Sequence, residues 1–73
     1  LLTDKILPNR IKEVNDTLKI VAEKSNKGDT TISTKAKAII SSYLGEGKKI
    51  TEATPNQIEL VEAALADLKA LVA

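Results

Sequence analysis

The sequence contains no cysteine, histidine, methionine, phenylalanine or tryptophan among its 73 residues. Without cysteine, neither a disulfide bond nor a thiolate zinc site can supplement the hydrophobic core. Without histidine and cysteine, the chain lacks the commonest general base and the most reactive nucleophile of enzymes. The sequence therefore predicts a protein that is not an enzyme, and we expect no metal site and no cofactor.

Two weaker patterns of catalytic residue types are better explained as solvated helix surface. Serine and lysine recur between residues 35 and 42, where a Ser–Lys pair is formally possible. Acidic residues stand three positions apart at Glu13 and Asp16, and again at Glu59 and Glu62. Each pair shares one face of a predicted helix, but that face is the polar one, so nothing marks the pair as a general acid and base.

Aromatic side chains are almost absent, since Tyr43 is the only one. The core must therefore be built from leucine, isoleucine, valine and alanine, which suits the packing of helix against helix. Because Tyr43 falls on a predicted apolar helix face, no aromatic ring is left on which a nucleic-acid base could stack. The net charge is only +1, although residues 1–49 carry +4 and residues 50–73 carry −3.

Long apolar runs are missing as well, and none approaches the ~20 residues that a membrane-spanning helix needs. The sequence therefore predicts no transmembrane segment. The chain opens with two leucines and not with methionine. Such a beginning is expected of a processed exported protein or of a trimmed segment, and the cellular compartment stays open.

The clearest positive signal is the C-terminal run 54–72. Thr54 suits the N-cap, Pro55 suits the first helical position, and Gln57 stands where a capping-box partner belongs. Apolar residues then recur at helical spacing: Ile58, Val61, Leu65, Leu68 and Val72, with Leu60, Ala64 and Leu71 beside them. So wide an apolar stripe predicts a helix over 55–72 that is buried against at least two others.

Two further helices are predicted over 8–26 and 30–44. Pro8 suits the start of the first, and Gly28 and Gly45 suit the ends of the two. Their apolar faces consist of Ile11, Val14, Leu18, Val21 and Ala22 in the first helix, and Ile32, Ala36, Ile39, Ile40, Tyr43 and Leu44 in the second. The sequence thus predicts one all-α domain over 1–73, a small three-helix bundle that runs up-down-up.

The segments outside these helices carry two expectations. Residues 1–7 are expected to form a short N-terminal arm or turn, because Pro8 disfavours helix in the residue before it; the alternative is that they join the next helix through a kink. In the connection 46–53, Lys48 and Lys49 are expected to be exposed, and Ile50 is expected to pack back onto the bundle.

Four residues are candidates for a protein-binding surface. Ile20 points away from the apolar stripe of its helix, and Ala63, Ala66 and Ala70 lie on the outer face of the last helix. The structural alternatives are that Ile20 packs under the N-terminal arm and that the alanines are simply good helix formers.

The leading hypothesis is a non-enzymatic helical module that binds another protein, whose identity the sequence does not give. The first alternative is a structural subunit that forms a homo-oligomer, because the last helix has coiled-coil-like apolar spacing. The second is a nucleic-acid-associated protein that uses the basic first helix, which the single arginine makes unlikely.

Overall fold

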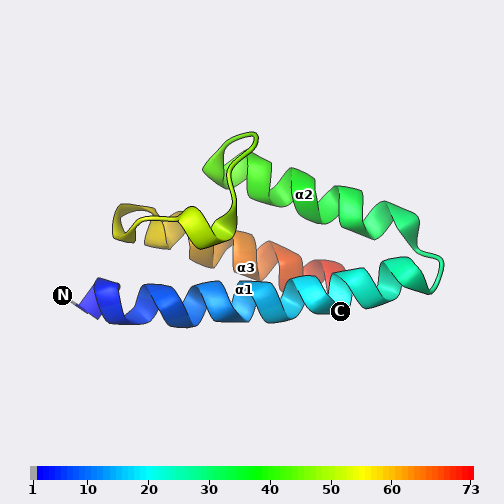
Figure 1. Ribbon diagram of the computed structural model, residues 1–73, viewed down its shortest axis with the longest axis horizontal. Coiled ribbons are helices and arrows are strands. Elements are labelled where there is room, and N and C mark those ends of the chain that lie inside the picture. The colour runs from blue at the N-terminus through cyan, green and yellow to red at the C-terminus, as the bar shows by residue number, and fades with distance from the viewer. Residues whose placement is uncertain (1) are drawn as a thin grey trace.

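The computed structural model describes residues 2–73, with side chains from residue 4 onward. It consists of three helices, α1 (Leu2–Asn26), α2 (Thr30–Leu44) and α3 (Ile58–Val72), and the described residues contain no strand. Two 3₁₀ turns, η1 (Ile50–Glu52) and η2 (Pro55–Gln57), lie in the connection between α2 and α3. The helices run up, down and up (Figure 1), so the predicted all-α three-helix bundle is confirmed.

Helix α3 packs against both of the other helices, as its wide apolar stripe predicted. Its buried residues are Val61, Ala64, Leu65 and Leu68, and neither Val61 nor Leu68 has any exposed surface. Burying a leucine or valine side chain stabilises the fold by roughly 1.5–3 kcal/mol. The buried stripe is narrower than predicted, however, because Leu60 stands on its flank and remains 38% exposed.

The predicted N-terminal arm is wrong for residues 2–7, because α1 begins at Leu2 and runs through Pro8. The first residue of that arm, Leu1, lies outside the described part of the chain. A proline inside a helix removes one backbone hydrogen bond and costs about 3 kcal/mol. Tertiary packing offsets this cost, because Leu7 is buried in the core cluster. Leu7, Val14 and Val21 recur every seven residues, and all three are buried, so they lie on one inner face of α1.

The buried face of α1 is also rotated slightly from the predicted one. Ala22, expected in the core, is exposed, and Thr17 is buried instead. The Thr17 hydroxyl donates to the backbone carbonyl of Glu13 at 2.9 Å. Because this local bond satisfies its polar group, a threonine can take a core position at little cost.

The glycines predicted to end the first two helices do so. Gly28 follows α1 with a φ of 120°, and Gly45 caps α2 with a φ of 103°. Residues with a side chain rarely adopt such angles, so glycine is the residue that each turn requires. The last helix begins with the predicted Thr54–Gln57 interaction, in which the Thr54 backbone N–H donates to Gln57 Oε1 at 2.9 Å. Its first turn is 3₁₀, so the α-helix proper starts at Ile58.

Candidate functional site

A hollow of about 460 Å³ lies between α1, α2 and the segment 45–57 that connects α2 to α3. Most of the surface that lines the hollow is apolar. The lining residues are Asn15 and Leu18 of α1; Lys37, Ile40 and Ser41 of α2; and Gly47, Lys48, Lys49, Ile50 and Thr51 of the connection. Ligand-binding clefts in proteins fall in the range of about 300–1,000 Å³. The hollow is therefore large enough to receive a ligand or a few side chains of a partner.

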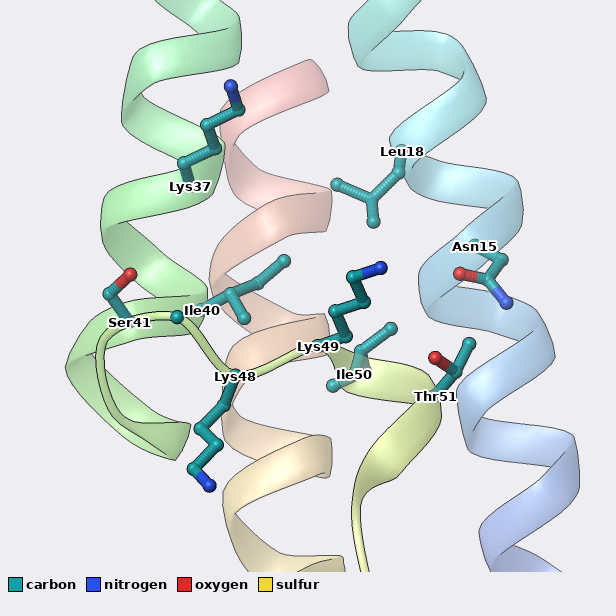
Figure 2. A pocket seen from close by; sticks show the side chains of 10 residues that line it. Asn15, Leu18, Lys37, Ile40, Ser41, Lys48, Lys49, Ile50 and Thr51 are labelled. Carbon is teal, nitrogen blue, oxygen red and sulfur yellow. The ribbon is translucent and has the colours of Figure 1, made fainter.

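The floor of the hollow is aliphatic. Figure 2 shows Leu18 of α1 facing Ile40 of α2, with Ile50 of the connection between and below them. Leu18 and Ile40 are half-buried, whereas Ile50 is only 4% exposed. The half-buried pair leaves apolar surface in contact with water, and a ligand could cover that surface with a gain in free energy.

Three lysines contribute to the lining beside this floor. In Figure 2, Lys49 extends upward into the space between Ile40 and Leu18, whereas Lys37 points along α2 and Lys48 points down and away. None of the three forms an ion pair with another residue in the described range 2–73. The residues lining the hollow include no aspartate or glutamate. The hollow therefore has a positive rim whose charges are not neutralised by its own lining.

The local sequence explains why this side of the bundle is open. After α2 ends, Gly45 and Gly47 both adopt positive φ and turn the chain back toward α1. Ile50 then enters the core, as predicted, and η1 contacts α1. The connection thus occupies part of the space between α1 and α2, and the hollow remains where it does not fill that space.

The other side of α1, toward α3, carries a charged cluster. Arg10 Nη1 donates to Glu13 Oε2 at 2.8 Å, and Arg10 Nε lies 3.4 Å from Glu62 Oε2 on α3. The hydrogen bond to Glu13, more than the weaker contact with Glu62, raises the pKa of the Arg10 guanidinium above its ordinary value. A smaller hollow of about 300 Å³ lies at this cluster, and Ala66 and Lys69 of α3 contribute to its lining. Its paired charges leave little net field for a charged ligand.

Helix α2 is joined to α3 by one side-chain hydrogen bond. The Tyr43 hydroxyl donates to Asp67 Oδ2 at 2.7 Å. This bond, with smaller contributions from desolvation and from the Asp67 charge, raises the pKa of Tyr43 above its ordinary value. Tyr43 thus acts as a structural donor and not as a proton acceptor near neutral pH.

The four predicted binding residues do not form one compact site. Ile20 is 42% exposed, and the alternative that an N-terminal arm covers it is wrong, since residues 2–7 belong to α1. Ala66 and Ala70 are exposed, while Ala63 is half-buried. Only Ala66 among them lines a hollow described above, the charged one between α1 and α3. Whether any of the four contacts a partner remains a prediction.

Sequence reasoning missed the hollow, although it singled out part of its lining. Lys48, Lys49 and Ile50 were recognised as an exposed pair followed by a buried residue. Leu18 and Lys37, by contrast, looked like ordinary core and surface residues of two separate helices. The one available signal was the neighbourhood of two glycines, two lysines and an isoleucine at 45–50.

No group of three or more histidine, cysteine, aspartate or glutamate side chains in the described residues could hold a metal ion. Within the same residues, no helix combines the length and the apolar character needed to cross a membrane. Comparison of the chain with protein-family models, with curated proteins and with solved structures finds no match. Any function must therefore be argued from the residues of this chain.

Proposed function

We propose that this chain is a non-enzymatic interaction module that binds a segment of another protein in the hollow between α1 and α2. The observation that carries the proposal is an aliphatic floor in a ligand-sized concavity, with three lysines around it that have no partner in the described residues. Most surface lysines lie over convex helix faces, where they are simply solvated. Here they line the same hollow as exposed apolar surface, and both features favour binding.

The lining of the hollow supports binding and not catalysis. Ser41 is its serine, and Lys37 lies one helical turn away on the same helix. Figure 2 shows the Lys37 amine extending away from Ser41, so this serine has no base beside it. A serine nucleophile needs a general base within hydrogen-bond reach.

The predicted face around Ile20 is the alternative place for the same function. A single exposed isoleucine is normal on a protein surface, and the neighbouring candidates are alanines without a shared cavity. The hollow combines shape, apolar surface and charge, and we therefore favour it over the Ile20 face.

The two other functional hypotheses have less support. Self-association was expected to use spare width in the apolar stripe of α3, but four of its eight residues are buried within the chain and three more are partly buried against the core. Nucleic-acid binding would rely on the basic residues of α1, of which Arg10 is already held by Glu13 and Glu62. We infer that the chain on its own is a monomer.

A selection from a random peptide library displayed on phage tests the proposed function. Peptides that bind the wild-type protein should lose binding to Ser41→Trp, because the indole fills the hollow. The matched control is Thr34→Trp, on the same helix but outside the lining of the hollow. Both variants should melt near the wild-type temperature in circular dichroism.

The selection also separates the two candidate surfaces. Peptides that bind Ser41→Trp normally but are lost on Ile20→Glu would move the function to the Ile20 face. If no selected peptide responds to either substitution, the interaction-module proposal fails for both surfaces.

A further inference from the structure

We infer that the partner segment bound in the hollow is acidic and carries an aliphatic anchor side chain. The inference rests on the proposed function and adds the chemistry of the partner. Its basis is the arrangement of Lys37, Lys48 and Lys49 around Leu18, Ile40 and Ile50.

The lysines are distributed along the hollow and are not gathered at one point. In Figure 2, Lys37 lies toward one end, Lys48 toward the other, and Lys49 between them. A ligand with a single anionic head group, such as a fatty acid, can meet only one of these positions well. A peptide with several aspartate or glutamate residues presents carboxylates at intervals, and its charge pattern therefore matches the distributed lysines better.

Within the described chain, no acidic residue lines the hollow beside these lysines. The nearest acidic residues along the connection are Glu46 and Glu52, both exposed, and neither lines the hollow. The three lysines form no ion pair with any residue in the range 2–73. Their amines can thus turn toward a partner without first breaking a bond within the chain.

The aliphatic floor of the hollow indicates the apolar part of the partner segment. Leu18 and Ile40 are half-buried aliphatic side chains, and Lys49 points toward the space between them in Figure 2. Lysine stems contribute apolar contact while their amines remain in water. A leucine, isoleucine or valine of the partner would rest on this floor, with its neighbouring carboxylates at the rim.

The experiment uses three short synthetic peptides of alternating sequence, binding being followed by the amide resonances of the labelled protein. One peptide alternates glutamate with leucine, the second replaces every glutamate with glutamine, and the third replaces every glutamate with lysine. Sodium laurate is added separately as the single-headed amphiphile. We expect the glutamate peptide to bind, with shifts concentrated at the residues lining the hollow, and to weaken as salt rises.

A pair of double variants tests the role of the rim. Lys37→Gln with Lys49→Gln should weaken the glutamate peptide by about two- to thirtyfold, as expected for the loss of two exposed ion pairs. Lys5→Gln with Lys69→Gln changes the net charge equally, outside the lining of the hollow. That control should bind the peptide like the wild type.

The outcomes separate this inference from the proposed function. Equal or tighter binding of the glutamine or lysine peptide at the hollow would overturn the acidic partner and keep the binding site. Tighter binding of laurate than of the glutamate peptide would replace the protein segment by an amphiphile. Absence of shifts at the hollow with every probe would overturn both, as would a dimeric solution mass together with concentration-dependent shifts at the residues lining the hollow.

Discussion

The two sides of α1 differ in how they are closed. Toward α3, α1 packs more extensively, and the seam is covered by Arg10 with its two glutamate partners. Toward α2, the connection 45–57 enters part of the space, and a hollow of about 460 Å³ remains. The same helix thus borders two hollows: a smaller one of about 300 Å³ whose lining has balanced charges, and a larger one whose charged lining residues are all lysines.

The difference shows what a small aliphatic bundle can use for recognition. With a single aromatic residue and no histidine or cysteine, the chain has few side chains that could form a chemically distinctive site. Shape and charge are left, and both depend on how the helices are separated. The connection, with two glycines and the buried Ile50, contributes to the lining of the hollow on one side of α1.

The largest expected effect on stability is at α3, the helix that packs against both of the others. Leu68→Ala should destabilise the fold by about 2–5 kcal/mol, because it leaves a cavity at a side chain that is completely buried. Leu60→Ala is the matched control on the same helix, and its cost should be much smaller, since Leu60 is 38% exposed. Urea unfolding followed by circular dichroism measures both, and equal costs would contradict the assigned orientation of α3.

A smaller loss of stability is expected when the buried side chain of Ile50 is shortened. Ile50→Ala should cost about 2 kcal/mol, near the lower end for buried isoleucine, because the connection can relax into the space. The same change should speed hydrogen exchange in 45–57 more than in α3. If hydrogen exchange rises equally in both segments, Ile50 does not anchor the connection 45–57 in particular.

The pairing of α2 with α3 should be visible in the titration of Tyr43. Because this is the only tyrosine, tyrosinate absorbance reports it directly, and its pKa should lie above 10.0 in the folded protein. Since folding raises this pKa, the stabilisation is complete below the unfolded value and is lost as pH rises through the folded one. Asp67→Ala should bring the pKa back toward 10.0, and an unchanged value in that variant would show that the bond does not form.

The smallest effect on stability is expected at Ile20. Ile20→Glu should change the free energy of unfolding by less than about 0.5 kcal/mol, as is usual for exposed positions. Its matched comparison is Ile40→Glu, which places a charge in the half-buried floor of the hollow and should destabilise the fold clearly. Similar melting temperatures for the two variants would mean that Ile40 is no more buried than Ile20.

The parts of the fold that local sequence determines could be predicted. The spacing of apolar residues in 58–72 indicated the inner face of α3, and the glycines at 28 and 45 indicated helix ends. The N-terminal arm was mispredicted because Pro8 acts against a helix locally, whereas burial of Leu7 favours one through contacts distant in sequence. The residue pattern of one helix does not show which of its side chains are buried by other helices.

The candidate site could be predicted only in fragments. The burial of Ile50 and the exposure of Lys48 and Lys49 follow from their local pattern. Their proximity to Leu18 and Lys37 depends on how far apart α1 and α2 stand, which is a property of the packed bundle. The Ile20 face, in contrast, was visible in the sequence because exposure on one helix needs no knowledge of the others.

The most direct test of the open side as the binding side is methyl NMR of the protein with a peptide selected from the random library. The methyl resonances of Leu18, Ile40 and Ile50 should shift as peptide is added, while those of Ile20 and Ala66 should stay in place. Shifts at Ile20 and Ala66, with Leu18 and Ile40 unchanged, would contradict the proposal and move the binding surface to those residues.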